Sequence, residues 1–119
     1  VIAPSNPFAA IDPILAIPGI ESTVRSHRQK TVAISPIVGG TAIKGPAHRM
    51  FKELGHESSV VGVAHHYRNL ASTLVIDKID AELANAVEDE GLRCVVTETV
   101  MRDTKIAAAL AKTALETVL

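Results

Sequence analysis

The sequence predicts an α/β fold, a parallel sheet with helices on both faces, and two observations lead to this prediction. Short runs of β-branched and aliphatic residues, typical of buried strands, alternate along the chain with segments of helical spacing. Glycine, proline or aspartate stands at the junctions between the two kinds of segment. With 119 residues the chain is long enough for one domain, so we expect residues 1–119 to form a single α/β unit.

Four apolar segments are predicted to be strands. The chain begins with Val1 to Pro4, the end of a strand, and Ser5-Asn6-Pro7 then has the composition of a turn. The other three strands are predicted at Thr31–Ile34, at Thr73–Ile76 ending at Asp77, and at Arg93–Val96 ending at Thr97. Because the chain starts with Val1 inside a strand, we expect it to be the C-terminal part of a longer protein.

Helices are predicted between these strands. A short apolar segment from Ile11 to Ile17 forms one or two turns, and Gly19–His27 follows as a helix with basic residues at its end. Pro46 suits the first turn of the next helix, because a proline lacks the N–H that would have no partner there. That helix carries Met50, Phe51 and Leu54 on one side and ends at Gly55.

Three further helices are predicted from caps and spacing. Ser58 is a candidate N-cap for a helix that buries one face, although Ser59-Val60-Val61 also suits a strand. The residues expected on the buried face are Val60, Val63, Ala64, Tyr67 and Leu70. Asp80 is predicted to cap a helix that ends near Glu90, and Asp103 or Thr104 to cap the last helix.

The segment from Thr31 to Pro46 is the most informative part of the chain. It combines a strand, a loop containing Gly39-Gly40, a lysine and the start of a helix. Free backbone N–H groups and the positive end of a helix dipole beside Lys44 suit an anion such as a phosphate. The loop is not a Walker A motif, because Pro46 stands where that motif needs lysine. An ordinary connection whose glycines permit a turn explains the same residues.

The four strand exits are expected to converge. In a parallel sheet all strands point the same way, so Ser5-Asn6, Ser35–Lys44, Asp77 and Thr97–Thr99 emerge at one edge. Open α/β sheets bind ligands at this carboxyl edge. The sequence therefore predicts a ligand site there.

Composition excludes several classes of function. The formal net charge is −1 with both signs interspersed, which gives no electrostatic footprint for nucleic acid or an anionic membrane. No apolar run reaches the roughly 18 residues of a membrane span, and the start of the chain shows no secretory signal. The single cysteine, Cys94, excludes an internal disulfide and is expected in the core. We expect a cytoplasmic protein.

No catalytic nucleophile, general base or metal site emerges from the residues alone. His65 and His66 are adjacent and would point about 100° apart on a helix, so they are interpreted as surface or boundary residues. His48 and Lys52 are interpreted as a solvated basic face. Asp77 and Asp80 have the spacing of an Mg²⁺ pair, but Asp80 has a competing role as a helix cap, which leaves Asp77 as the candidate at the rim.

Three blocks of the sequence together resemble the 2-phospho-L-lactate transferase family. The first comprises Pro4-Ser5-Asn6-Pro7 and Pro13 to Ile20, and the second Ser35 to Gly40 with Lys44 to Ala47. Val75-Ile76-Asp77 and Val96 to Met101 match weaker downstream pieces. The resemblance covers essentially the whole chain but only the C-terminal part of a family protein. The family usually shows Ser and Gly where this chain has Ala10 and Asp12, and Asp where it has Glu98.

The resemblance implies a Rossmann-like fold and an enzyme of coenzyme F-420 biosynthesis. It implies transfer of a 2-phospholactyl or phosphoenolpyruvyl group from a guanosine-diphosphate-activated donor to the deazaflavin Fo, with release of GMP. Mg²⁺ is implied as well, with its ligands upstream of Val1, and we expect a homo-oligomer. The nucleotide- and phosphate-binding residues are expected to be Ser5, Asn6, Ser35, Ile37, Val38, Gly39, Gly40, Lys44 and Gly45. Asp77 and Thr97 are candidates for a substrate or metal rim.

Two other functions stay open at this stage. The related gluconeogenesis-factor proteins share the Pro-Gly-Ile block and recognise UDP-sugars, but they lack a segment like Ser35–Gly40. An interaction half-domain without activity of its own is also compatible with the chain, because the glycine-rich nucleotide loop of the family would lie upstream. In that case the isolated chain gives no product from Fo and donor, a result we expect even from a true transferase fragment.

Overall fold

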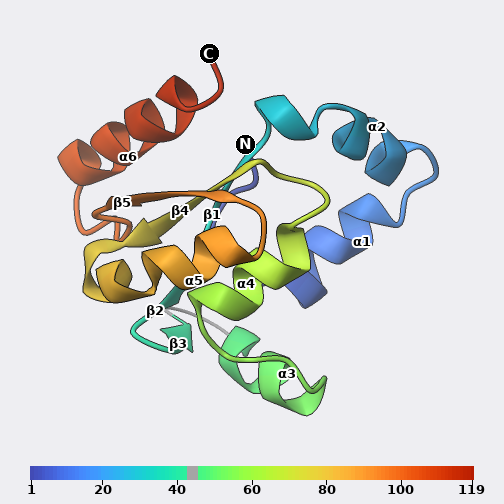
Figure 1. Cartoon of the computed structure of the whole chain (residues 1–119), viewed down its shortest axis with the longest axis horizontal. Helices are drawn as coiled ribbons and strands as arrows, with labels where there is room; N and C mark the ends of the chain where they lie inside the picture. Colours follow the sequence, from blue (N-terminus) through green and yellow to red (C-terminus); the bar gives the residue numbers. More distant parts are fainter. Residues whose placement is uncertain (43–45) are drawn as a thin grey trace.

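The main sheet is parallel, as predicted. The computed structural model describes residues 1–42 and 46–119. Three strands run in the order β1 (Val32–Ile34), β4 (Thr73–Asp77) and β5 (Arg93–Thr97), with both pairs parallel (Figure 1). The start of the chain lies along the outer edge of β1, where Ile2 N–H donates to the Val32 carbonyl at 2.8 Å and Ile34 N–H to the Ile2 carbonyl at 3.0 Å. The four predicted segments therefore share one layer.

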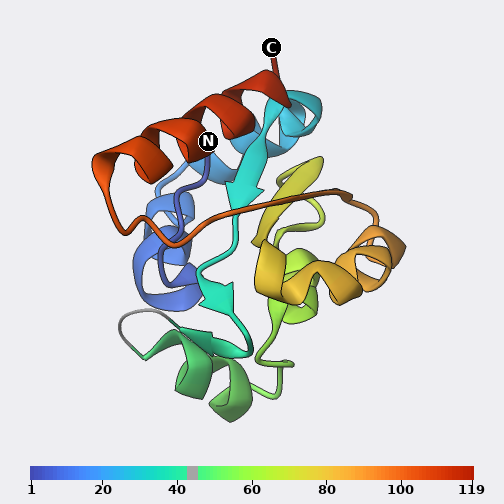
Figure 2. The ribbon, with the colours of Figure 1, turned by 90° about the vertical axis from the view of Figure 1, so that its left-hand side faces the viewer.

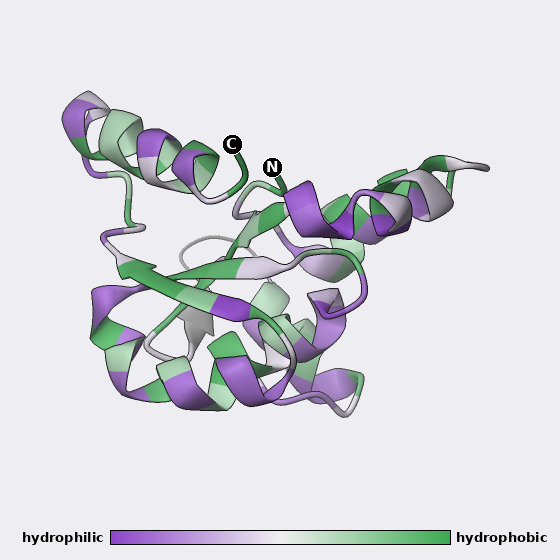
Figure 3. Cartoon of the chain, turned by 45° about the horizontal axis from the view of Figure 1, so that its top comes forward, coloured by the Kyte–Doolittle hydropathy of each residue, from purple (hydrophilic) through white to green (hydrophobic). Residues whose placement is uncertain are grey.

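Alternation along the strands divides the core between the two faces of the sheet. Leu74 and Ile76 of β4 contribute to one cluster of buried residues, and Val75 contributes to the other. This is the period of two expected of a pleated strand. All five residues of β4 are buried, whereas β5 is the half-exposed edge strand, and Figure 3 shows the largely apolar colour of the strands.

Helices cover both faces of the sheet, as Figures 1 and 2 show. On one face α3 (Ala47–Glu53), α4 (Val60–Tyr67) and α5 (Ala84–Asp89) pack through Phe51, Tyr67 and Val87, among others. On the other face α6 (Thr104–Glu116) packs Leu110 and Ala114 against the sheet. The predicted α/β class with helices on both faces is thus confirmed. No helix in the described ranges is long and apolar enough to cross a membrane.

Shorter elements complete the chain. A π-turn, η1 (Pro7–Ile11), leads into α1 (Asp12–Leu15) and α2 (Ile20–Ser26), and a 3₁₀ turn, η2 (Arg28–Lys30), precedes β1. A second 3₁₀ segment, η3 (Lys78–Leu83), connects β4 to α5. The strands β2 (Ile37–Val38) and β3 (Thr41–Ala42) form a separate antiparallel pair.

The helical face predicted after Ser58 is confirmed, with one change in its cap. Val60, Val63, Ala64, Tyr67 and Leu70 are all buried, and the alternative strand at residues 59–61 is wrong. The cap is Ser59 rather than Ser58, since the Ser59 hydroxyl oxygen accepts from the N–H groups of Val61 and Gly62. Asp103 caps α6 as predicted.

Two predictions for the segment between β1 and the end of α3 are wrong. The loop after β1 is not a direct connection to a helix but the hairpin β2–β3, with Gly39 and Gly40 at φ 61° and 80°. Positive φ at two successive residues is typical of the two-residue turns that connect hairpin strands, because the twist of such a turn matches that of the strands. Leu54 was expected on the buried side of α3 but is 56% exposed.

Asp80 does not cap a helix. Asp77 takes that role for η3, because its carboxylate accepts the Ile79 N–H at 3.0 Å. Asp80 has non-helical backbone angles and forms a kink within η3, and the predicted single helix is instead the two elements η3 and α5. Gly91 follows with φ 99°, as expected of a residue just after a helix.

Cys94 is a partly buried residue packed against the larger core cluster. Burial, with a smaller contribution from Glu88, raises the pKa of its thiol to about 11. A thiol with so high a pKa is a poor nucleophile at neutral pH. The expectation that Cys94 lies in the core is met only in part, since the residue is partly buried and packs against the core cluster.

Gly62 is essential for the contact between α4 and the segment that precedes it. A Cβ atom built at Gly62 would lie 1.8 Å from the Glu57 carbonyl oxygen, which is far inside van der Waals contact. We predict that Gly62→Ala lowers the free energy of unfolding by about 3 kcal/mol or more, because backbone must move to admit a methyl group. Urea unfolding followed by circular dichroism measures this change.

Gly55→Ala is the matched control for Gly62→Ala. Gly55 has φ 77° and open space around the added Cβ, so this substitution costs only backbone strain, about 1–2 kcal/mol. Equal effects of the two substitutions would contradict the steric explanation for Gly62.

Candidate functional site

A hollow of about 250 Å³ lies at the carboxyl edge of the sheet. Three segments far apart in sequence line it: the start of the chain, the loop after β1 and the loop after β5. The lining residues are Pro4, Ser5, Asn6, Ser35, Pro36, Val38, Thr99, Val100 and Met101. The predicted convergence of the strand exits therefore exists, and we call this cavity the strand-exit hollow.

Several polar groups of the strand-exit hollow support its own walls. The Asn6 side-chain oxygen accepts from the N–H groups of Phe8 and Ala9 at 3.0 and 3.1 Å, and its amide donates to the Met50 sulfur at 3.2 Å. Ser35 is buried, with 2% of its surface exposed. Its hydroxyl donates to the Ile37 carbonyl and accepts the Ile37 N–H, each at 3.1 Å. These bonds connect the lining residues Asn6 and Ser35 to neighbouring segments and so fix the wall.

Asp77 joins the exits of β4 and β5. Its Oδ2 atom accepts the Thr99 N–H at 2.9 Å and the Thr99 hydroxyl at 3.2 Å, while Oδ1 accepts the Ile79 N–H. Burial raises the pKa of this carboxyl, but the hydrogen bonds from Thr99, Ile79 and Val100 outweigh burial and lower the pKa below its usual value of 3.8. Asp77 is thus held ionised as a link between two loops.

Asp80 reaches the hairpin instead of a helix end. Its Oδ2 atom accepts the Gly39 N–H at 2.9 Å, and the residue is only 6% exposed. The Gly39 amide, predicted to hold a phosphate oxygen, is therefore occupied by a carboxylate of the chain itself. A role for Gly39 in holding a phosphate stays a prediction.

His48 and Ser58 hold the other side of the same turn. His48 Nδ1 lies 2.8 Å from the Gly40 carbonyl oxygen and 2.6 Å from Ser58 Oγ. The half-buried His48 is therefore a link between α3 and the hairpin, not part of a solvated basic face as predicted. Sequence reasoning missed this contact because His48 and Ser58 join a loop that was expected to continue directly into a helix.

The remaining predicted site residues fall into three groups. Ile37 is fully buried, and Val38 lines the strand-exit hollow. Lys44 and Gly45 lie outside the described residues. Thr97 pairs with Asp77 in the sheet, and neither residue is among those that line the hollow. Their role at a substrate rim stays a prediction.

Among the residues that the structure describes, charge lies beside the strand-exit hollow and not in its lining. Lys78, just after β4, donates to Glu98, just after β5, at 2.9 Å. Arg102 Nη1 lies 3.9 Å from the other Glu98 oxygen. All three side chains are substantially exposed, so these pairs contribute little stability. The lining itself consists of neutral polar and apolar residues.

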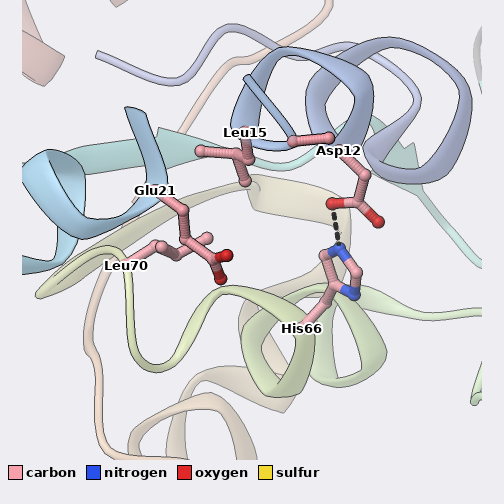
Figure 4. A pocket seen from close by; sticks show the side chains of 6 residues that line it. Asp12, Leu15, Glu21, His66 and Leu70 are labelled. Carbon is pink, nitrogen blue, oxygen red and sulfur yellow. Dashed lines mark hydrogen bonds and ion pairs between the residues drawn. The ribbon is translucent and has the colours of Figure 1, made fainter. Parts of the chain in front are cut away.

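A second hollow, of about 300 Å³, lies beside α1 and α4 (Figure 4). His66 Nε2 is 2.9 Å from Asp12 Oδ1 across it, and Glu21 faces the same space while forming an ion pair with Arg25. Asp12, one of the departures from the family pattern, is thus paired with His66 and does not line the strand-exit hollow. Within residues 1–42 and 46–119, no group of three or more His, Cys, Asp or Glu residues is placed to hold a metal ion.

Comparison with known proteins decides the family. The family model described as "2-phospho-L-lactate transferase CofD" matches residues 1–116. The chain belongs to the CofD family. Among curated relatives, it is 38% identical over 116 residues to a 2-phospho-L-lactate transferase of Methanocaldococcus jannaschii, an alignment that covers 98% of the chain and 36% of that relative.

Relatives with two different names match this CofD-family chain. A phosphoenolpyruvate transferase of Streptomyces griseus is 38% identical over 117 residues, which is 98% of the chain and 37% of the relative. A 2-phospho-L-lactate transferase of Methanosarcina barkeri is 36% identical over 112 residues, 94% of the chain and 36% of the relative. The chain therefore spans little more than a third of the length of these curated relatives.

The Asp77 contacts predict a pH-dependent stability in this CofD-family chain. Because the pKa of Asp77 is lowered on folding, its stabilisation is complete above the usual value of 3.8 and disappears as the pH falls through the folded-state pKa. At pH 7 we expect Asp77→Asn to lower the free energy of unfolding by about 2 kcal/mol, typical of hydrogen bonds to a charged acceptor. Urea unfolding between pH 7 and pH 2 should show this difference shrinking below about pH 4.

Asp89→Asn provides the control for this experiment, since Asp89 is an exposed aspartate at the end of α5. It should change stability by less than about 0.5 kcal/mol at every pH. A difference between wild type and Asp77→Asn that did not depend on pH would contradict an ionised, hydrogen-bonded Asp77.

Proposed function

We propose that this chain contributes part of the active site of a transferase in coenzyme F-420 biosynthesis. The reaction proposed moves a 2-phospholactyl or phosphoenolpyruvyl group from a guanosine-diphosphate-activated donor to the deazaflavin Fo and releases GMP. The observation that carries the proposal is the strand-exit hollow, built from the sequence blocks that resemble the family and located where α/β sheets bind ligands. Relatives named for phospholactate and for phosphoenolpyruvate transfer match the chain, so the donor acid stays open between these two.

The lining of the strand-exit hollow suits one part of the proposed ligand better than another. Prolines, Val38, Val100 and Met101 offer apolar walls, while Ser5, Asn6 and Thr99 add neutral polar groups. Such a cavity favours the flat, uncharged ring of a substrate over its phosphates. In the proposal the phosphate oxygens lie toward cationic side chains, with Lys44 as the residue that holds them.

Phosphoryl-type transfer requires little covalent chemistry from the protein. A hydroxyl of the acceptor attacks the phosphorus, the bond to the leaving GMP breaks, and negative charge grows on the leaving group and the equatorial oxygens. Such reactions depend mainly on positioning and charge stabilisation. The loops after β1 and β5 would orient the reactants and exclude water, and no residue of the chain is assigned as general base.

Magnesium does not fit the acidic residues of the described chain. Asp77 and Asp80 have the right spacing, but their carboxylates accept backbone N–H groups of Thr99, Ile79 and Gly39. We therefore derive no step through a metal from this chain. In the proposal any Mg²⁺ ligands come from elsewhere in the full-length enzyme.

An interaction half-domain without activity of its own is a second candidate. The chain spans only 36–37% of the first two relatives described above, so a complete active site would need residues that it does not contain. Both this candidate and the transferase proposal predict that the isolated chain forms no product from Fo and donor, so an activity assay distinguishes them only in a full-length protein.

The first test is an NMR titration of the isotope-labelled chain with GDP and, separately, with UDP. We expect amide shifts around Ser5-Asn6 and Ile37–Val38 with GDP and much smaller shifts with UDP. Shifts with UDP alone would contradict the proposal in favour of a UDP-sugar binder. If neither nucleotide moves the spectrum, the binding function of the isolated chain is refuted, and the test below decides the transferase proposal.

We predict that Lys44→Ala in a full-length family member that carries this chain weakens GDP binding at least tenfold. A lysine–phosphate contact is a charge-assisted hydrogen bond, worth about 1.5–3 kcal/mol. Calorimetric titration measures the affinity, and Lys52→Ala, on the exposed side of α3, is the control. Unchanged GDP affinity in Lys44→Ala would remove Lys44 from the site, and absence of transfer activity in the parent protein would refute the transferase proposal.

A further inference from the structure

Two buried carboxylate side chains lie where β4 meets η3. Asp77 and Asp80 are three residues apart, and each is 6% exposed. Each accepts a backbone N–H from a different loop, Asp77 from Thr99 at 2.9 Å and Asp80 from Gly39 at 2.9 Å. The partner residues are 22 and 41 positions away in the sequence, so both contacts are long-range.

These contacts reach opposite walls of the strand-exit hollow. Thr99 lines the hollow directly, on the side formed by the loop after β5. Gly39 follows Val38, which lines the hollow on the side formed by the loop after β1. The central strand, β4, lies between β1 and β5, so a carboxylate pair at its exit can reach both neighbouring loops.

We propose that Asp77 and Asp80 form a carboxylate bracket that fixes the separation of the two walls of the strand-exit hollow. Both are positioning residues that act through Thr99 and Gly39. The structural part of this inference stands on the hydrogen bonds alone, and its consequence for ligand binding rests on the proposed function.

The geometry favours a bracket over a metal site for this acidic pair. Asp77 uses both oxygens, accepting Ile79 N–H at Oδ1 and two Thr99 groups at Oδ2. A metal ion would have to replace these bonds and leave buried N–H groups without partners, which is costly. The turn held by Asp80 is also held from its other side by His48, 2.8 Å from the Gly40 carbonyl oxygen.

Asp77 and Asp80 should respond differently to amide substitution. Asp80 accepts one hydrogen bond from Gly39, and the side-chain oxygen of an asparagine can still accept one. Asp80→Asn should therefore retain the wall, whereas Asp80→Ala should release it. Asp77 accepts at both oxygens, so Asp77→Asn presents its NH₂ group either to Ile79 or to Thr99, whereas Asp77→Ala removes both contacts and should release the loop after β5.

Amide hydrogen exchange in the 119-residue chain tests the bracket without any ligand. We expect Asp80→Ala to speed exchange at Gly39 about tenfold or more, with Asp80→Asn close to wild type. Asp77→Ala should speed exchange at Thr99 and leave Gly39 unchanged. Asp89→Asn, at an exposed aspartate, is the control and should change neither amide. Asp77→Asn replaces Asp77→Ala as the test if that variant does not fold, and should then speed exchange at Ile79 or Thr99, whichever N–H faces its NH₂ group.

Affinity for GDP in a full-length family member provides the second readout. We expect Asp80→Ala to weaken GDP binding about tenfold while Asp80→Asn restores it, at a temperature where both variants are folded. Loss of Gly39 protection with unchanged affinity would overturn the positioning role. Failure of wild type to bind GDP would refute the proposed function and leave the exchange test of the bracket intact.

Two results would overturn the bracket itself. The first is equal exchange at Gly39 in wild type and Asp80→Ala. The second is Mg²⁺ added alone to the wild-type chain shifting the Asp77 and Asp80 side-chain carboxyl resonances at millimolar concentration, an effect abolished by Asp80→Asn. That second result would make the pair a metal site.

Discussion

The burial of β4 is the constraint on which the rest of the structure depends. All five of its side chains are buried, so its backbone polar groups must find partners within the protein. Parallel ladders to β1 on one side and β5 on the other satisfy them. That arrangement places the exits of β1 and β5 on either side of the β4 exit and forces three polar loops together. The loops after β1 and β5, together with the start of the chain, enclose the strand-exit hollow.

Features that depend on local periodicity could be predicted from the sequence. The apolar runs, the buried face of α4 and the alternation of strands and helices require only neighbours a few residues away. The convergence of Ser5-Asn6, the loop after β1 and the loop after β5 then follows from parallel topology, with no knowledge of side-chain contacts. The motif blocks indicate the family independently of the predicted topology, and the family model confirms it. The same blocks contain the residues that line the hollow.

Features that depend on distant partners could not be predicted in this way. Aspartate is a residue type favoured at helix N-caps, which is why Asp80 was a candidate. Its carboxylate instead accepts the N–H of Gly39, 41 residues away, and Asp77 caps η3. The Gly39-Gly40 turn suits both a hairpin and an anion loop, and pairing between Ile37 and Ala42 decides for the hairpin. His48 was interpreted as a surface residue because its partners, Gly40 and Ser58, belong to two different loops.

The absence of charge from the described lining residues bears on where the proposed enzyme would hold each part of its ligand. The proline, valine, methionine and neutral hydroxyl groups among these described residues can hold a ring, but they cannot balance the charge of phosphates. Asp77 and Asp80, at the exit of β4, are engaged by backbone N–H groups, and the ionised Asp77 carboxylate repels a nearby phosphate. Their hydrogen bonds fix the walls but leave that negative charge in place. A ligand with a neutral ring and a charged tail would then bind with its ring between the walls and its phosphates directed away from β4.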